Sequence, residues 1–287
     1  MIANIALGLL GLGIVVFVHE LGHFVAARLV GIDVDAFSVG LGRAILKKKI
    51  RGVEYRLGMF PLGGYCGMRG ADGTTDEAGE QDTPEPAKGS YFAAGPLRRI
   101  AVCLAGPVFN LVFAAMVFSI ILGVGHSLDT GTGMSPQAAV AGGVRMTWKV
   151  LVLSVDGISG IFRDRNVTDL AGPARLIYMV GDAATASFEY DAAAGATLGE
   201  SIAAGAETMA FLLAFVSIAI AIMNLLPIPV FDGGRIVLYL VELVRRKPTP
   251  PRALMVFQTV GVVMVAALMI FVFFGDTMFF VGRFGGR

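Results

Sequence analysis

Two histidines and a glutamate stand close together in the first apolar stretch of the chain, as His19, Glu20 and His23. Residues four apart lie on the same face of a helix, so the imidazoles of His19 and His23 can bind one metal ion together. Glu20 lies beside them, where its carboxylate can take a proton from a water molecule on that metal. Ionisable groups in an apolar segment are costly, about 2.5–3.5 kcal/mol each on insertion scales, so we interpret the cluster as a metal site and not as a polar contact between helices.

A third ligand must come from elsewhere, because a catalytic zinc site takes three protein ligands and leaves a position for water. The candidates are His126 and the carboxylates. His23 lies seven residues before the end of the first apolar stretch, about 10 Å at helical rise. His126 follows the opposite end of the second stretch, whereas Asp232 follows the third stretch on the matching side. Neighbouring prolines and glycines allow the backbone to turn back there, so we expect Asp232 to be the ligand; the alternative is that Asp232 only caps the next helix.

The composition places these residues in a membrane protein. Hydrophobic residues make up 55% of the 287 residues and charged residues 16%, and the mean hydropathy is +0.74; average globular proteins have about 25% charged residues. The net charge of +1 gives no basic surplus for binding nucleic acid. Two cysteines, Cys66 and Cys103, are too few for a disulfide framework or a four-cysteine zinc site.

The predicted fold is an α-helical polytopic membrane protein with four transmembrane helices and a small membrane-associated β-hairpin. Four stretches reach the length of about 20 apolar residues that crosses a bilayer. They are Ile5–Val30, Ile100–Val124, Met209–Leu226 and Ala253–Phe274. Lys and Arg concentrate in the first and third connections, which places these on the inner side and both termini on the outer side.

Three regions follow from this topology. Residues 1–124 hold the first two helices and an inner hairpin, with strands expected over Phe37–Leu46 and Val53–Phe60 and a basic turn over Lys47–Gly52. Residues 125–208 form an outer loop with an interfacial helix over Arg145–Ile158, marked by Trp148 beside Lys149. Residues 209–287 hold the last two helices.

Three segments of the sequence resemble motifs of a known protein family. His19–His23 and Asn224–Gly234 resemble the site-2 protease family of intramembrane zinc metalloproteases, whose signatures are HExxH and NxxPxPxxDG, and both signatures match at every fixed position. Gly106–Asn110 is similar to the GPxxN motif of the bacterial branch that cleaves anti-sigma factors. Gly42–Tyr65 looks like the membrane-reentrant β element of that branch.

The resemblance implies zinc bound by the two histidines and Asp232, with Glu20 as general base. It also implies that Asn224 holds the substrate backbone. Asn110 and Tyr65 become candidate substrate contacts, although an asparagine at this position is more often a hydrogen bond between packed helices, and a tyrosine more often an interfacial anchor. The branch normally carries PDZ domains between its second and third helices, and residues 125–136 are too short for one.

The implied activity is hydrolysis of a peptide bond within or near the membrane span of a single-span protein, for example an anti-sigma factor already cut on its outer side. The implied location is the bacterial inner membrane, with the substrate and the lipid bilayer as partners and no nucleic acid. Two rivals stay open: a membrane metal transporter, which predicts further ligands along the spans, and a non-catalytic scaffold that binds substrates, against which an intact Glu20 argues.

The hairpin has two possible roles. A helical substrate must unwind before water can reach a carbonyl, and pairing the unwound segment with a strand edge would replace its lost hydrogen bonds. We expect the exposed edge for this pairing within Val53–Phe60. The alternative is that the hairpin is a structural lid.

Overall fold

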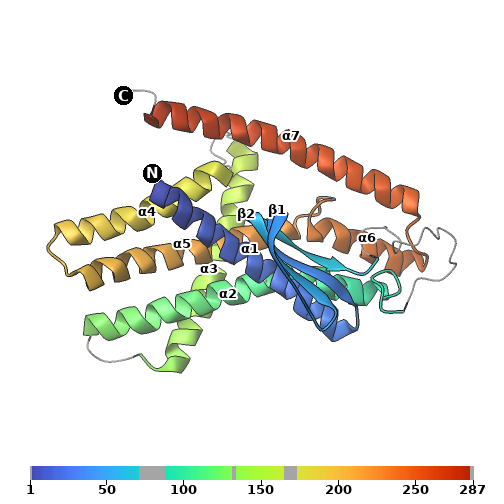
Figure 1. Cartoon of the computed structure of the whole chain (residues 1–287), viewed down its shortest axis with the longest axis horizontal. Coiled ribbons are helices and arrows are strands. Elements are labelled where there is room, and N and C mark those ends of the chain that lie inside the picture. The colour runs from blue at the N-terminus through green and yellow to red at the C-terminus, as the bar shows by residue number, and fades with distance from the viewer. Residues whose placement is uncertain (1, 71–87, 131–133, 165–172, 285–287) are drawn as a thin grey trace. The chain divides into compact units, whose positions relative to one another are not determined.

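The computed structural model describes residues 2–70, 88–130, 134–164 and 173–284. In these ranges the chain forms helices and one two-stranded sheet (Figure 1). In chain order the elements are α1 (Ile2–Val30), β1 (Val34–Ile50), β2 (Val53–Met68), α2 (Pro96–Thr130), α3 (Pro136–Asp164), α4 (Pro173–Ala193), α5 (Leu198–Leu225), α6 (Asp232–Arg245) and α7 (Pro251–Phe284).

The helices agree with the expected class of fold, but their number differs. By length and composition, five helices in the described ranges are long and apolar enough to cross a membrane. The four expected spans lie in α1, α2, α5 and α7, and the fifth is Pro136–Gly157 in α3. This segment is rich in alanine and glycine and has a mean hydropathy of 1.4, the lowest of the five. A mostly helical fold with a small antiparallel sheet and several helices able to cross a membrane is therefore confirmed, whereas the number of four spans is not. The helix expected over Arg145–Ile158 lies inside α3.

The chain divides into two compact units, each with its own core. One comprises residues 1–12, 111–222 and 262–287, and the other comprises residues 13–110 and 223–261. In the first unit, Phe118 of α2 and Ile218 of α5 are buried together with Val150 of α3. The candidate site residues other than His126 lie in the second unit.

The core of the second unit joins α1, the sheet, α2 and α6. Phe37 of β1, Val53 of β2, Val102 of α2 and Tyr239 of α6 belong to one buried cluster, which also contains Ala27 of α1. Burying a large apolar side chain contributes about 1.5–3 kcal/mol. This cluster therefore holds the elements that carry the candidate site residues against one another.

The hairpin turn is shorter than the basic segment suggested. β1 and β2 are joined by Arg51 and Gly52, whose φ angles are +49° and +89°. Two successive residues with positive φ are typical of a two-residue type I′ turn, which matches the twist of the flanking strands. Strand pairing accordingly continues to Ile50 opposite Val53, through most of the expected turn Lys47–Gly52.

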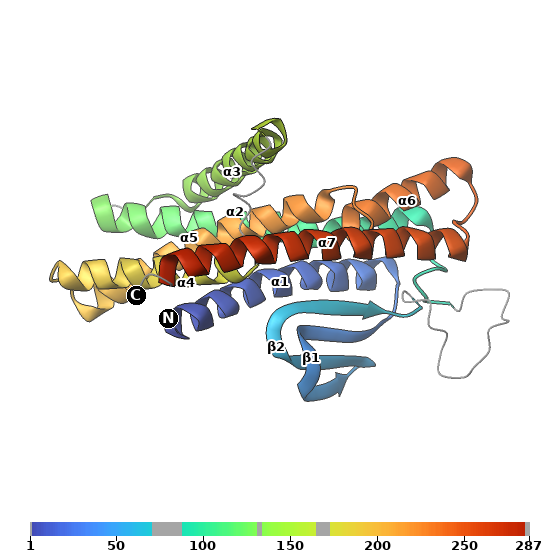
Figure 2. The same ribbon diagram turned by 90° about the horizontal axis from the view of Figure 1, so that it is seen from above.

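The two strands curve over, as Figure 2 shows, so that the hairpin pairs with itself. Phe37 is paired with both Tyr55 and Cys66, while Tyr55 is paired with both Phe37 and Lys48. Residues 54–57 therefore lie inside the sheet, and its edges are residues 44–50 and 64–68. Gly58 permits the bend, because a Cβ there would lie 2.5 Å from the carbonyl carbon of Gly40. The expectation of an exposed edge within Val53–Phe60 is wrong for residues 54–57.

Candidate metal centre

Two elements bring the three expected ligands together. His19 and His23 lie one turn apart on α1 and are each 7% exposed. Asp232 is the first residue of α6 and follows the proline-containing turn after α5. Gly233 and Gly234 let this turn close, because side chains there would collide with the carbonyl groups of the residues before the helix. Asp232 is thus the first residue of a helix whose N-cap is Phe231, so it is not the cap that the alternative expected, and its carboxylate reaches the histidines.

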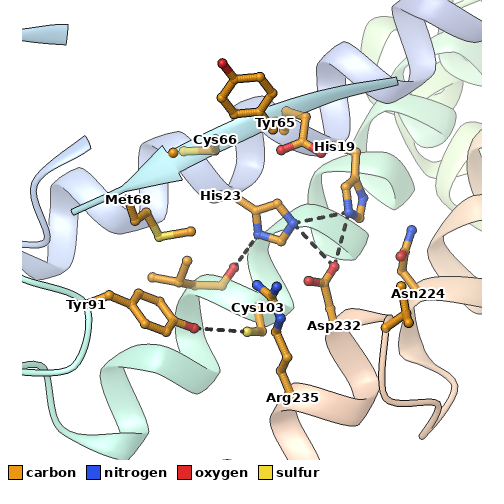
Figure 3. A pocket seen from close by; sticks show the side chains of 14 residues that line it. His19, His23, Tyr65, Cys66, Met68, Tyr91, Cys103, Asn224, Asp232 and Arg235 are labelled. Carbon is orange, nitrogen blue, oxygen red and sulfur yellow. Dashed lines mark hydrogen bonds and ion pairs between the residues drawn. The ribbon is translucent and has the colours of Figure 1, made fainter. Parts of the chain in front are cut away.

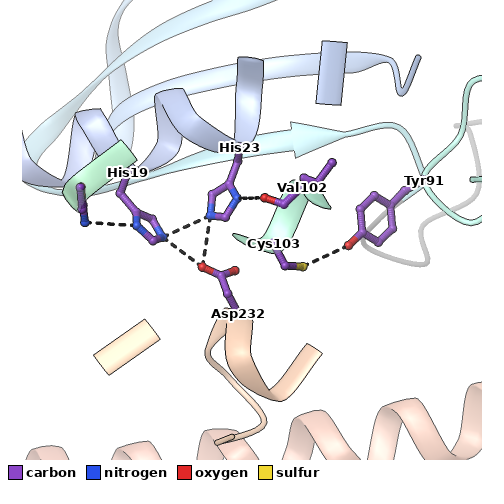
Figure 4. Close-up of polar contacts among 7 residues, drawn as sticks. His19, His23, Tyr91, Val102, Cys103 and Asp232 are labelled. Atoms are coloured by element: carbon purple, nitrogen blue, oxygen red, sulfur yellow. Dashed lines mark hydrogen bonds and ion pairs between the residues drawn. The ribbon is translucent and has the colours of Figure 1, made fainter. Parts of the chain in front are cut away.

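The ligand atoms form a nearly equilateral triangle (Figure 4). Oδ2 of Asp232 lies 3.1 Å from Nε2 of His19 and 3.3 Å from Nε2 of His23, and the two Nε2 atoms are 3.2 Å apart. Zinc bonds of about 2.0–2.1 Å in tetrahedral geometry separate neighbouring ligand atoms by about 3.3 Å. Three ligands at these separations fit zinc and leave a fourth position for water. The side chain of His126, the other candidate, lies outside the described part of the chain.

Both imidazoles are oriented by contacts at their other ring nitrogen. Nδ1 of His23 donates a hydrogen bond of 2.8 Å to the carbonyl oxygen of Val102, which leaves the lone pair of Nε2 for a metal. Nδ1 of His19 lies 3.3 Å from Nδ2 of Asn110. Asn110, predicted as a possible substrate contact or a hydrogen bond between helices, is buried on α2 against a candidate ligand.

Local charges and burial set the protonation of two groups outside the apolar helices. Burial favours the neutral carboxyl of Asp232, but its contacts with His19 and His23 outweigh burial and hold its pKa below the usual value. The carboxylate is therefore ionised, as a metal ligand must be. Burial and the nearby Glu20 carboxylate raise the pKa of Cys66 to about 12, so its thiol stays neutral.

A cavity of about 350 Å³ opens beside the ligands, in the size range of small-ligand pockets (Figure 3). Glu20, Tyr65 and Asn224, all predicted from the sequence, line it. The hydroxyl of Tyr65 accepts a hydrogen bond of 2.8 Å from Arg56. The edge strand 64–68 forms part of the cavity wall, and the opposite edge, 44–50, does not. A peptide bound in the cavity would therefore lie beside both the ligands and a strand edge.

Sequence reasoning missed several residues of this cavity. Arg235 lines it one turn after Asp232 on α6, and the spacing of three residues was the available signal. Cys66 and Cys103 line it as well, although nothing in their spacing indicated this. Gly106 of α2 lies directly against the imidazoles: a Cβ there would be 2.6 Å from Nε2 of His23 and 2.7 Å from Cε1 of His19. Gly106 belongs to the GPxxN motif, but the motif alone does not predict its contact with the imidazoles.

Comparisons with known proteins give matches over most of the chain. Residues 7–268 match the sequence model of Peptidase family M50, and no PDZ domain is matched. A protein of Treponema pallidum is 43% identical over 46% of this chain and 30% of its own length. Proteins of Campylobacter jejuni and Clostridium perfringens are 26% and 27% identical, over 93% and 96% of this chain and 91% and 98% of their own lengths.

Each of these relatives carries the name "Putative zinc metalloprotease". Zinc is thus the metal that the relatives' names and the expected ligand set have in common. The alignment with the Campylobacter protein spans 341 positions, more than the 287 residues of this chain, so that relative has residues without a counterpart here. For the Treponema protein the chain covers less than a third of the relative's length.

Proposed function

Because the chain belongs to peptidase family M50, the site-2 protease family, we propose that it is an intramembrane zinc metalloprotease that cuts a single-span membrane protein within or near its membrane span. The single observation that carries this proposal is the triangle of His19, His23 and Asp232, whose ligand atoms lie 3.1–3.3 Å apart in a cavity that Glu20 also lines. Three ligands, an adjacent carboxylate and space for a peptide are the parts that hydrolysis requires.

Zinc in this site would polarise the scissile carbonyl and lower the pKa of the attacking water. Glu20 then removes the proton from that water and delivers it to the leaving amine. Asn224, which lines the same cavity, is proposed to hold the backbone of the substrate next to the scissile bond, and Tyr65 to contact it from the sheet. The hydrogen bond between His23 and Val102 keeps one ligand ring in place throughout.

We propose that the substrate pairs with the strand edge 64–68 in an extended conformation. A helical substrate hides its carbonyls, and strand pairing would replace the hydrogen bonds lost on unwinding. The edge 64–68 lines the cavity that contains the ligands, whereas residues 54–57 are paired on both sides. This places the pairing on a different segment from the one that the sequence suggested.

Further parts of the proposal rest on the sequence. The Lys and Arg distribution favours an inner membrane protein with both termini on the outer side. A bacterial anti-sigma factor, already cut on its outer side, is the proposed kind of substrate, with the lipid bilayer as the other partner. No PDZ domain is matched in this chain, so selection of substrates by such a domain forms no part of the proposal.

Two rival functions make different predictions. A metal transporter needs a series of sites along its path, and the described residues contain one group of three or more His, Cys, Asp or Glu side chains that could hold a metal. A non-catalytic scaffold needs no base, yet Glu20 lines the cavity together with the complete ligand set. Both features favour hydrolysis.

Substitution of Glu20 by glutamine tests the proposal. Purified wild-type and Glu20→Gln proteins in lipid nanodiscs are each mixed with a single-span test substrate, and zinc content is measured beside cleavage. Glu20→Gln keeps the shape of the side chain but removes the base, so we expect unchanged zinc and loss of cleavage. Cleavage near the wild-type rate would refute the role of Glu20, and a wild-type protein without zinc or cleavage would refute the function.

Proline substitutions test the strand pairing. Only alternate N–H groups of a strand point to its free edge, so prolines are placed at Tyr65 and Cys66 in separate variants. At least one of them should slow cleavage while leaving zinc bound, and a glycine in the substrate span should partly restore the rate. Prolines at Lys47 and Lys48, on the edge that lies away from the cavity, are the matched controls. Equal rates for both edges would leave the hairpin as a structural lid.

A further inference from the structure

We infer that Asn110 is a positioning residue for the metal site, because its side-chain amide fixes the ring of His19. The inference rests on the proposed function and deepens it. It concerns the ring nitrogen of His19 that faces away from Asp232. The alternative role for Asn110 is a hydrogen bond that only packs α2 against α1.

The contact uses the ring nitrogen that a metal would not. Asn110 is 0% exposed, and its Nδ2 lies 3.3 Å from Nδ1 of His19. Nε2 of the same ring lies 3.1 Å from Oδ2 of Asp232. One ring nitrogen of His19 therefore faces the other ligands while the second faces Asn110. A side chain held at both nitrogens cannot rotate without losing one of these contacts.

Metal binding defines what Nδ1 of His19 needs. A metal takes the lone pair of Nε2 when the ring proton is on Nδ1, and that buried N–H then requires an acceptor. The terminal amide of asparagine has oxygen and nitrogen in nearly the same shape, so a turn of 180° brings Oδ1 to Nδ1. Asn110 can thus accept from the His19 ring just as the Val102 carbonyl accepts from His23 at 2.8 Å.

The two histidines differ in the kind of group that can accept the hydrogen bond from Nδ1. For His23 it is a backbone carbonyl of α2, which no substitution removes. For His19 it is a side chain of the same helix, eight residues further along. Loss of a hydrogen-bond partner to a ligating histidine typically weakens metal binding about 10–100-fold. We therefore expect the zinc affinity of this protein to depend on Asn110.

The experiment measures zinc affinity by competition with a chelator, for wild type and three variants of the 287-residue chain. Asn110→Ala removes the acceptor and should weaken zinc binding about 10–100-fold. Asn110→Asp supplies a carboxylate acceptor in the same place and should bind zinc within a few-fold of wild type. Ser119→Ala, which removes a hydroxyl that bonds to its own helix at Ala115, is the matched control on α2 and should not change the affinity.

A role in packing alone predicts a different pattern. Wild-type zinc affinity in Asn110→Ala would overturn the inference, and so would an Asn110→Asp protein that binds zinc as weakly as Asn110→Ala. If Asn110→Ala does not fold, Asn110→Ser takes its place, since its hydroxyl is too short to reach Nδ1. The visible spectrum of the cobalt-loaded proteins gives a second readout, because a rotated imidazole changes the ligand geometry. A wild type that binds zinc and cuts substrate keeps the proposed function whatever these variants do.

Discussion

Gly106 offers a sharp test of the metal centre, because its position has no room for a methyl group. A Cβ at residue 106 would lie 2.6 Å from Nε2 of His23 and 2.7 Å from the Cε1 atoms of both His19 and His23. Non-bonded carbon atoms prefer about 3.5–4.0 Å. In Gly106→Ala the rings must therefore move by nearly 1 Å, or the helix α2 must withdraw by as much.

The expected effect on zinc is much larger than the effect on folding. Ligand distances in metal sites hold to within about 0.2 Å, so a shift of nearly 1 Å removes at least one imidazole from the site. We expect zinc affinity to fall at least about 100-fold, which is the upper end of the effect of removing a residue that hydrogen-bonds to a metal ligand. Overpacking costs about 1–3 kcal/mol, and alanine gains about 1 kcal/mol over glycine in a helix. The net loss of folding stability is therefore about 0–2 kcal/mol.

The assay compares zinc affinity, thermal unfolding and cleavage for wild type, Gly106→Ala and Gly123→Ala. Gly123 is the matched control on α2, because a Cβ there meets Ala139 at an ordinary contact distance of 3.6 Å. The control should bind zinc and unfold like wild type. A Gly106→Ala protein with wild-type zinc affinity would refute the reasoning, since it would show that the imidazoles can move without leaving the ligand set.

Three further predictions concern the same unit. Asp232→Ala leaves two ligands, so zinc occupancy should fall below half at micromolar zinc by elemental analysis; full occupancy would exclude Asp232 as a ligand. Arg99 donates a hydrogen bond of 2.8 Å to the buried carboxylate of Glu242, so Arg99→Met leaves this carboxylate with the Thr249 N–H but without its counter-charge. This should cost about 3–5 kcal/mol of unfolding free energy, largely restored by methionine at both positions, and an effect below about 1 kcal/mol would contradict it. The pKa of Cys66 is raised from 9.0 to about 12, so alkylation at pH 8 should be about a thousandfold slower than in the unfolded chain and should accelerate as pH rises toward 12; equal rates in both states would show an ordinary thiol.

The local parts of the site could be predicted from the sequence because short spacing determines them. A separation of four residues places His19 and His23 on one face whatever the rest of the chain does. Asp232 is predicted as a ligand because it follows the third apolar stretch on the same side as His23 and because prolines and glycines allow the backbone to turn back there. Its Oδ2 lies 3.1 Å from Nε2 of His19, as that prediction requires. Contacts between distant segments were not accessible in this way. The bend that encloses residues 54–57 depends on a close approach of Gly40 and Gly58, which no local pattern reveals.

Helix α3 and the position of Asn110 show the same limit. The alanine and glycine residues of α3 are individually weak hydrophobic signals, so the sequence predicts an interfacial helix over Arg145–Ile158 only, whereas the helix runs over Pro136–Asp164 and is, by length and composition, able to cross a membrane. Asn110 belongs to a sequence motif, but the motif does not show which residues its side chain contacts, since asparagine suits both substrate binding and helix packing. The distance of 3.3 Å between Nδ2 of Asn110 and Nδ1 of His19 shows that its side chain contacts His19.

The separation of the ligands along the chain has a consequence for the newly made protein. His19 and Asp232 are 213 residues apart, so a ribosome adding about 5–20 residues per second needs about 10–40 s to supply the last ligand after the first. During that time the growing chain holds two ligands and binds zinc weakly. The proposed peptide-bond hydrolysis is thereby withheld from a chain still being inserted beside other nascent membrane proteins, and a chain that terminates before Asp232 lacks one of the three candidate ligands.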